Sequence, residues 1–210
     1  MTIAVERPTQ LKPFTFEEFL AQYGDDDRYE LIDGEIFDLE ATGPHEEVAA
    51  FIDRKLNVQI DHSELPYFIP QRCLIKPLGD WTGLRPDLVV LDKTQLSAEP
   101  LWPKEAIITL GHSVKLVVEV VSSNWQNDYA RKVDEYAILG IPEYWIVDYA
   151  ALGGLEFIGR PKQPTLTICI LGNDGYYEKQ RLRGDDRICS SIFPSLNLTA
   201  AQVLSTGSGC

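Results

Sequence analysis

Residues 114–121, Val-Lys-Leu-Val-Val-Glu-Val-Val, carry the clearest signature of a buried strand in the chain. A nearly continuous apolar run is typical of a strand that is covered on both faces of its sheet. A second apolar run, Asp-Leu-Val-Val-Leu at residues 87–91, follows directly after Pro86. The two runs predict central strands of a sheet that has helices packed against it.

The chain that follows the first run predicts a crossover to a parallel strand. Residues 128–139 have helical apolar spacing, Gly140 is suited to end that helix, and Pro142 prevents its continuation. Residues 143–149 then form another apolar run, which predicts a strand. The order strand, helix, strand predicts a mixed sheet with a helical crossover.

The remaining elements are predicted from local signals on both sides of this centre. Thr15 and Glu18 form a capping box for a helix at 16–23, and Asp33-Gly34 is a hairpin signal. Pro44 is suited to the start of a helix at 45–60. The predicted strands outside the centre are 28–32, 35–39, 67–77, 155–159, 165–171 and 176–182, with a loop at 101–112 and a short helix at 199–204.

No internal repeat or linker divides the chain, so we expect one α/β domain at residues 14–204. Its mixed central β-sheet is flanked by helices and has extra strands toward both ends. Residues 1–13 are expected to form a flexible arm, and residues 205–210 a disordered tail.

The composition is that of a globular protein, with 44% hydrophobic and 24% charged residues. No apolar run has the length of a membrane span, and the N-terminus lacks a signal-peptide pattern. We therefore expect a cytoplasmic protein without a membrane partner. The four cysteines lack zinc-site spacing and are expected to be free thiols.

The net charge of −13 and the pI of about 4.6 bear on any nucleic-acid function. Neutralisation of phosphates by basic residues supplies much of the affinity of nucleic-acid-binding proteins. The bulk charge therefore argues against tight binding of DNA without metal, although a divalent cation would offset part of the repulsion.

Two carboxylates stand in the apolar runs, Glu119 inside the first and Asp87 at the start of the second. Taken alone, Glu119 could pair with an arginine or lysine, and Asp87 could cap a turn. If the two strands are neighbours, the carboxylates converge at one end of the sheet and repel each other unless a proton or a metal lies between them. Oxygen ligands of this kind suit Mg²⁺.

Further candidates are Ser122, Asp128 and Lys132, which follow Glu119 in the chain, and His45, which precedes it. Lys132 stands four residues after Asp128, which suits either a surface ion pair or a lysine that reaches back to the end of the Glu119 strand. Ser122 is expected to cap the loop. His45, at the predicted helix start, is either a solvated side chain or a site residue whose pKa the helix N-terminus lowers.

The pattern resembles the PD-(D/E)XK nuclease superfamily and, more closely, the Uma-type family of restriction endonucleases, formerly a domain of unknown function. The resemblance covers residues 14–204 and rests on several motifs in the right order. The matching pieces are Tyr29 to Glu35, His45, Arg85-Pro86-Asp87, Glu119 to Ser122, Asp128, Lys132, Tyr136, Glu143 to Asp148 and Ile192-Phe193-Pro194.

The resemblance implies a restriction-endonuclease-like core in which Asp87, Glu119 and the backbone carbonyl of Val120 bind Mg²⁺, with Mn²⁺ as a substitute. The superfamily pattern has a lysine two residues after the glutamate, where this chain has Val121. The resemblance therefore assigns the catalytic lysine to Lys132, with His45 as an assisting residue. Glu35 and Glu47 are lesser candidates for a third carboxylate.

The function that follows is a Mg²⁺-dependent endonuclease that hydrolyses phosphodiester bonds of nucleic acid, with DNA as the expected substrate. By analogy with restriction-type nucleases, we expect a homodimer. The alternative is a non-catalytic binding or assembly module that retains the fold, which the acidic charge and Val121 favour. A metal-free hydrolase that uses the two carboxylates as general acid and base ranks third.

Overall fold

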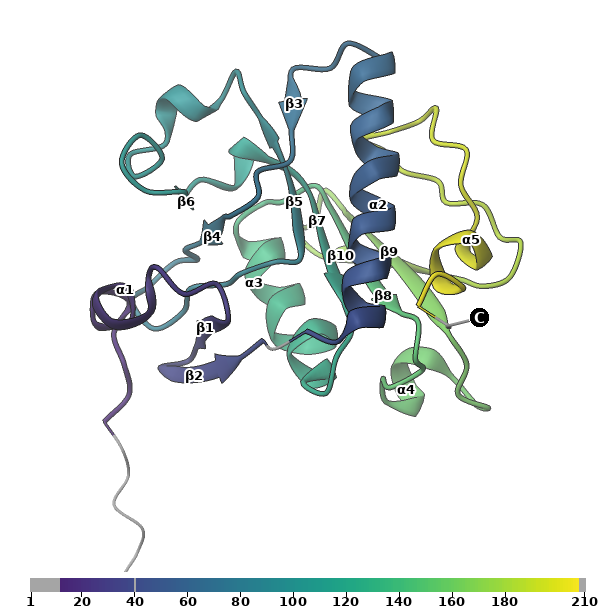
Figure 1. Ribbon diagram of the computed structural model, residues 1–210, viewed down its shortest axis with the longest axis horizontal. Coiled ribbons are helices and arrows are strands. Elements are labelled where there is room, and N and C mark those ends of the chain that lie inside the picture. The colour runs from purple at the N-terminus through teal and green to yellow at the C-terminus, as the bar shows by residue number, and fades with distance from the viewer. Residues whose placement is uncertain (1–11, 40, 208–210) are drawn as a thin grey trace, which may run out of the picture.

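The computed structural model describes residues 12–39 and 41–207, and its centre is a six-stranded sheet (Figure 1). The strand order is β10–β9–β8–β7–β5–β3. Strands β7 and β8 are parallel, and the other neighbouring pairs are antiparallel, which confirms the predicted mixed sheet. The strands are β3 (Tyr67–Phe68), β5 (Leu88–Asp92), β7 (Val114–Val120), β8 (Glu143–Asp148), β9 (Thr165–Leu171) and β10 (Tyr177–Leu182).

The crossover from β7 to β8 is helical, as predicted. It begins with the π-helical turn η3 (Asn127–Arg131) and continues as α3 (Lys132–Ile138). Gly140 follows with a φ of 77°, a backbone conformation that glycine adopts without steric cost. The parallel strands are therefore connected by a helix that lies on one face of the sheet.

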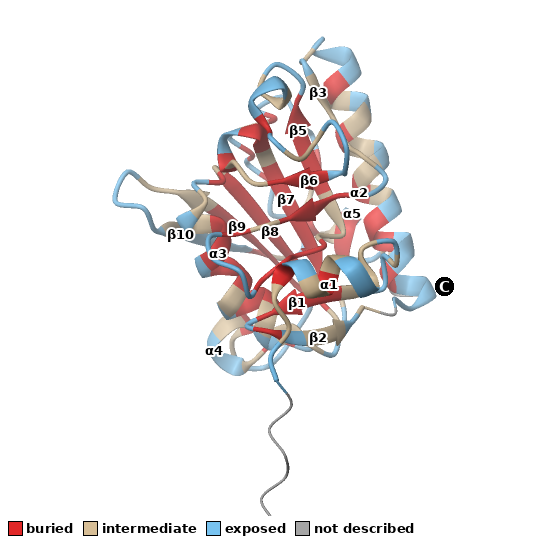
Figure 2. Cartoon of the chain, turned by 90° about the vertical axis from the view of Figure 1, so that its left-hand side faces the viewer, coloured by how far each residue is buried: buried red, intermediate tan, exposed pale blue. Residues whose placement is uncertain are grey.

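Helices cover the sheet on both faces, so its central strands β7 and β8 are almost wholly buried, whereas the edge strand β10 is mostly exposed (Figure 2). The long helix α2 (Gly43–His62) packs against β7, and the short helix α5 (Ala200–Leu204) packs against α2 and β9; Val118 and Val120 of β7 belong to the same core. On the opposite face, α3 packs against Val117 and the adjoining Val121. Because side chains alternate along a strand, Glu119 points to the same face as Val117 and Val121, as the sequence predicted.

A smaller layer outside the central sheet is formed mostly by the N-terminal part of the chain. It contains α1 (Phe16–Tyr23), the hairpin β1 (Tyr29–Ile32) and β2 (Glu35–Asp38), and the parallel pair β4 (Leu74–Ile75) and β6 (Ile107–Ile108). The capping box at Thr15 is present, and Asp33 and Gly34 both have positive φ, as the predicted turn requires. A bridge between Leu31 and Gly83 joins the hairpin to the segment that leads into β5.

The structure corrects three of the sequence predictions. Residues 155–159, predicted as a strand, contain the short helix α4 (Leu155–Ile158), which ends at Gly159 with a φ of 75°. The predicted strand 67–77 is interrupted and supplies only β3 and β4, which belong to different sheets. The predicted loop 101–112 contains β6 and the start of the 3₁₀ turn η2 (Gly111–Ser113), and another such turn is η1 (Leu96–Ala98).

The two ends of the chain lie only partly within the described residues. Residues 1–11 of the predicted arm and 208–210 of the predicted tail lie outside them. Ser205 and Thr206 of the predicted tail form backbone hydrogen bonds with α5. Within the described ranges, no helix combines the length and apolar character that a membrane crossing requires.

Candidate functional site

Strand pairing places Asp87 and Glu119 at the same end of the sheet. Leu88 of β5 is opposite Val118 of β7, so the antiparallel register sets Asp87 opposite Glu119. Both residues line a cavity of about 190 Å³ at this end. Asp87 Oδ2 also accepts a hydrogen bond of 2.6 Å from the Val120 backbone N–H, which fixes its carboxylate against the end of β7.

Lys132 lies in the first turn of α3 and is buried against the same carboxylate cluster. Its Nζ is 3.1 Å from Glu119 Oε1, 3.2 Å from Glu30 Oε1 and 3.3 Å from Asp128 Oδ1. All four side chains are less than one-tenth exposed. The geometry therefore contradicts the alternative that Asp128 and Lys132 form an ordinary surface pair.

The second contact of Glu119 Oε1 is with Tyr136, one turn along α3. The Tyr136 hydroxyl donates a hydrogen bond of 2.8 Å to Glu119 Oε1, and both side chains are buried. One oxygen of the Glu119 carboxylate is thus held by two groups from α3. Neither contact involves its other oxygen, Oε2.

His45 lies in the first turn of α2 and reaches the site from the other face of the sheet. Its Nε2 is 2.9 Å from the Val120 carbonyl oxygen and 3.4 Å from Asp87 Oδ2. The ring is buried, and its Nδ1 has no hydrogen-bond partner among the described residues. His45 is therefore a buried part of the site, so the alternative of a solvated histidine is wrong.

The expectation of a lowered His45 pKa is also wrong. Burial opposes protonation of the ring, but the hydrogen bond and negative charge of Asp87, together with the Val120 carbonyl, outweigh it. The net result is a raised pKa of His45. The cause is Asp87, a carboxylate that the sequence alone does not place beside the histidine.

Burial of Glu119 and Asp128 opposes the ionisation of their carboxyl groups and therefore raises the pKa of each. It raises the pKa of Glu119 well above the usual value, against the attraction of Lys132, and the charges of Asp87, Asp128 and Glu30 add to the increase. Burial likewise raises the pKa of Asp128 to about 7. The surrounding carboxylates outweigh the burial of Lys132 and raise its pKa, so its ammonium stays charged.

The charges lining the cavity are unbalanced. Four carboxyl groups line it, Glu30, Asp87, Glu119 and Asp128, against three basic side chains, Lys132, His45 and Arg85, and the Arg85 guanidinium is already paired with Asp27. A further cation would relieve this excess of negative charge, and carboxylate and carbonyl oxygens are the ligands that Mg²⁺ takes in proteins. The residues present therefore fit a divalent ion.

A site of this kind has few protein ligands. Across residues 12–39 and 41–207, no group of three or more His, Cys, Asp and Glu side chains is arranged to hold a metal ion. Asp87, Glu119 and the Val120 carbonyl contribute only two such side chains. Mg²⁺ often keeps several waters and uses only one or two carboxylates, so a set of this size is chemically sufficient.

The structure adds Glu30 to the site and removes two other glutamates. Glu30 of β1 contacts Lys132 and also accepts a 3.2 Å hydrogen bond from the Arg85 backbone N–H. Glu35 and Glu47, the carboxylates considered from the sequence, are both exposed. The available signal for Glu30 was a charged residue within the otherwise apolar strand Tyr-Glu-Leu-Ile.

Arg85 is a second residue that sequence reasoning left without a role. Its guanidinium donates to the carbonyl oxygens of Gly24 at 2.8 Å and Tyr29 at 2.9 Å, and it pairs with Asp27 at 3.1 Å. Arg85 therefore connects the end of α1 and the start of β1 to the segment that leads into Asp87. Ser122 lines the cavity, but no hydrogen bond to another described residue supports its predicted capping role.

Two comparisons with known proteins give a match. The model of the Uma2 family, described as "Putative restriction endonuclease", matches residues 16–201. A solved structure with the same fold is that of "a putative nuclease belonging to DUF820" from Anabaena variabilis ATCC 29413, with a TM-score of 0.68 and 17% sequence identity. The match covers 93% of this chain and 99% of that chain. No curated protein matches the sequence.

Proposed function

Since the chain belongs to the Uma2 family, whose model bears the description "Putative restriction endonuclease", we propose that it is a Mg²⁺-dependent endonuclease acting on DNA. The observation that carries this proposal is the position of Asp87 opposite Glu119, with the Lys132 ammonium 3.1 Å from the Glu119 carboxylate. Two carboxylates can hold a metal ion that assists hydrolysis of a phosphodiester. A lysine beside them can stabilise the charge that develops on the phosphoryl group.

Asp87, Glu119 and the Val120 carbonyl would hold the metal ion. When bound, Mg²⁺ or Mn²⁺ supplies a Lewis acid for a phosphate oxygen and lowers the pKa of a bound water. Tyr136 and Lys132 both contact Glu119 Oε1, so they orient this carboxylate and leave Oε2 for the ion.

Lys132 would take the role of the lysine that the superfamily pattern puts on the strand. The corresponding residue, Val121, is buried in the core beneath α3 and cannot serve. Lys132 carries its charge into the same cavity from the helix. There its ammonium would orient the attacking water or stabilise negative charge on the phosphoryl oxygens in the transition state.

His45 would act as a positioning residue. With a proton on Nε2, its ring donates to the Val120 carbonyl at 2.9 Å and faces Asp87 at 3.4 Å. These two contacts orient two of the three proposed metal ligands from the α2 side. Outer partners of this kind typically change metal affinity or activity by about 10 to 100-fold when they are removed.

One observation favours the second candidate, a non-catalytic module that retains the fold. Lys132 is surrounded by three buried carboxyl groups. A buried ionic cluster can have a purely structural role, here to specify the packing of α3 against β1 and β7. In that case the cavity would bind neither metal nor phosphate. Calorimetric titration with Mg²⁺ and Mn²⁺ separates the two candidates, because the module should bind neither ion at millimolar concentration.

Cleavage of single- and double-stranded DNA with Mg²⁺ or Mn²⁺ tests the proposed function. Asp87→Asn and Glu119→Gln should each lower the rate by about a hundredfold or more, because even outer partners of a metal cost 10 to 100-fold. Glu47→Gln is the matched control, since Glu47 is an exposed carboxylate on the same helix as His45. Activity that survives both site substitutions, or that persists in EDTA, would refute the assignment.

We further propose that the chain acts as a homodimer in the cytoplasm. Dimerisation rests on analogy with restriction-type nucleases, which commonly cut two strands with two subunits. Light scattering of the purified chain gives the mass directly, and a monomer across the concentration range would contradict this part of the proposal.

A further inference from the structure

One segment of this acidic chain has an excess of basic residues. Residues 160–183 contain five basic and two acidic side chains, a net charge of +3, whereas the whole chain carries −13. The remainder of the chain therefore carries −16. We call the five cations the basic face: Arg160, Lys162, Lys179, Arg181 and Arg183.

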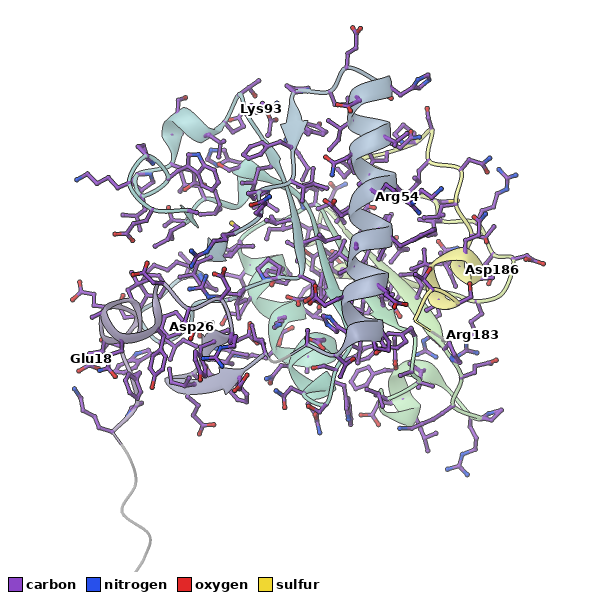
Figure 3. All side chains as sticks on the ribbon, viewed as in Figure 1. Glu18, Asp26, Arg54, Lys93, Arg183 and Asp186 are labelled. Atoms are coloured by element: carbon purple, nitrogen blue, oxygen red, sulfur yellow. The ribbon has the colours of Figure 1, made fainter. Side chains whose placement is uncertain are left out.

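Arg160, Lys162 and Arg183 of the basic face lie at the same end of the sheet as the candidate active site, whereas Lys179, opposite Cys169, lies farther along β10. Val120 pairs with Val147, Asp148 pairs with Thr165, and Leu182 pairs with Leu166, so these strand ends form one edge. The loop 159–164, which carries Arg160 and Lys162, enters β9 at this edge. Figure 3 shows Arg183 there, on the side of the molecule away from Lys93.

Three of the five cations converge on the segment around α4. Lys162 Nζ donates to the Leu152 carbonyl at 3.1 Å, and Arg181 Nη2 donates to the Glu156 carbonyl at 2.8 Å. Arg183 donates to the Ile158 carbonyl and to Thr165. Leu152 also lines the active-site cavity, so the basic face is continuous with the mouth of that cavity.

The charges of the basic face are not neutralised locally. Among the described residues, none of its five side chains forms an ion pair with a carboxylate. The hydrogen bonds of Lys162, Arg181 and Arg183 are to carbonyl and hydroxyl oxygens. Most of the five are exposed, with Arg183 half-buried. In contrast, the buried arginine Arg85 and the exposed Arg72 share the carboxylate of Asp27.

An unpaired cluster of cations beside a site for phosphodiester hydrolysis indicates the partner. We propose that the basic face binds the backbone of duplex DNA on one side of the scissile phosphate; this inference rests on the proposed function. Release of counterions from the phosphates would supply affinity for DNA although the bulk charge of −13 opposes binding.

The surface chemistry favours a duplex over a single strand. Single-stranded DNA is generally bound by grooves in which aromatic side chains stack on successive bases. Trp81 and Tyr176 are the markedly exposed aromatic side chains of the described residues, and only Tyr176 lies near the basic face, in the turn before β10. Contacts to phosphates alone are sufficient for a duplex.

Fluorescence anisotropy with a labelled DNA duplex in EDTA tests the inference without cleavage. The test variant removes three exposed cations of the basic face: Arg160→Gln, Lys162→Gln and Lys179→Gln. The control variant makes the same change of charge elsewhere: Arg54→Gln, Lys93→Gln and Lys104→Gln. Arg54 and Lys93 both lie away from Arg183 in Figure 3.

The test variant should bind the duplex at least about fivefold more weakly than wild type. The slope of log affinity against log salt concentration should decrease in magnitude by about 2 to 3, because each lost phosphate contact contributes about 0.9. The control variant should stay within about twofold of wild type, since its cations lie outside the basic face.

The inference would be overturned if the wild type did not bind the duplex at low salt, or if wild type and test variant bound it with equal affinity. It would also be overturned if the control variant lost as much duplex affinity as the test variant. Tighter binding of single strands or of anionic lipid vesicles than of the duplex would overturn it as well. Failure of the proposed function is distinguishable, because it would appear as intact binding in EDTA with no cleavage after Mg²⁺ or Mn²⁺ is added.

Discussion

The Lys132 ammonium lies 3.1 Å from Glu119 Oε1, and it reaches this carboxylate from helix α3 rather than from the strand that carries Glu119. The same ammonium contacts Glu30 of β1 and Asp128 of η3. One buried cation thus connects three elements at the end of the sheet. The consequences for stability and for the reaction can be tested separately.

Lys132→Met should destabilise the fold strongly, because it leaves three buried carboxyl groups without their cation. Breaking one side of a buried ion cluster typically costs about 3 to 5 kcal/mol. Lys115→Met is the matched control: Lys115 pairs with Asp92 at 3.2 Å in a partly exposed setting and should cost about 1 kcal/mol or less. Urea denaturation gives both free energies of unfolding, and equal costs would contradict the account.

The free energy of unfolding should fall as the pH rises from about 4 to about 7 in metal-free buffer. Burial raises the pKa of Asp128 from its usual 3.8 to about 7, so the folded chain binds this proton more tightly than the unfolded chain. Stability from such a group is lost as the pH rises toward its folded pKa. Asp128→Asn should flatten this dependence, measured by urea denaturation at several pH values in EDTA.

Asp134→Asn provides the comparison for that measurement, because Asp134 is an exposed carboxylate on α3. It should keep the pH dependence of the wild type. An Asp128→Asn variant with the same pH slope as wild type would show that Asp128 is ionised in the fold across this range.

Tyr136→Phe should lower the cleavage rate by about 10 to 100-fold, as expected for the loss of an outer partner of a metal ligand. The substitution removes the 2.8 Å hydrogen bond to Glu119 Oε1 and leaves the ring in place. Tyr144→Phe removes a hydroxyl that donates to the Asp128 backbone carbonyl instead, so its rate should change far less. Equal rates for the two variants would remove Tyr136 from the site.

Mg²⁺ should raise the melting temperature of the wild-type chain. An ion that binds only the folded state at a hundredfold excess over its dissociation constant stabilises it by about 2.7 kcal/mol. The double variant Asp87→Asn, Glu119→Gln should lose this response, whereas Glu47→Gln should keep it. Differential scanning calorimetry with and without EDTA measures the shift, and a response that survives in the double variant would place the ion elsewhere.

The centre of the fold and the principal carboxylates could be predicted because their signals are local. The apolar runs identified β5, β7 and β8, and the family match over residues 16–201 confirms the predicted resemblance. The pairing of β5 with β7 was only a condition of the sequence prediction, and the structure establishes it. Asp87 and Glu119 are conspicuous because a carboxylate is costly to bury in such a strand.

The errors have equally specific causes. Residues 155–159 contain strand-forming side chains, but Gly154 precedes them and Gly159 adopts a positive φ, which permits a short helix to begin and end there. Glu30 could not be placed, because its approach to Lys132 depends on how the β1–β2 hairpin docks on the sheet. The basic face was hidden in the bulk charge, since the sequence alone does not bring residues 160–183 beside the cavity.

The most direct test of the central claim is the anomalous X-ray signal of Mn²⁺ in crystals of the wild-type chain. The account predicts one strong peak within bonding distance of the Asp87 carboxylate, the Glu119 carboxylate and the Val120 carbonyl oxygen. A fully soaked crystal without a peak between these groups, or with the ion bound elsewhere, would contradict it.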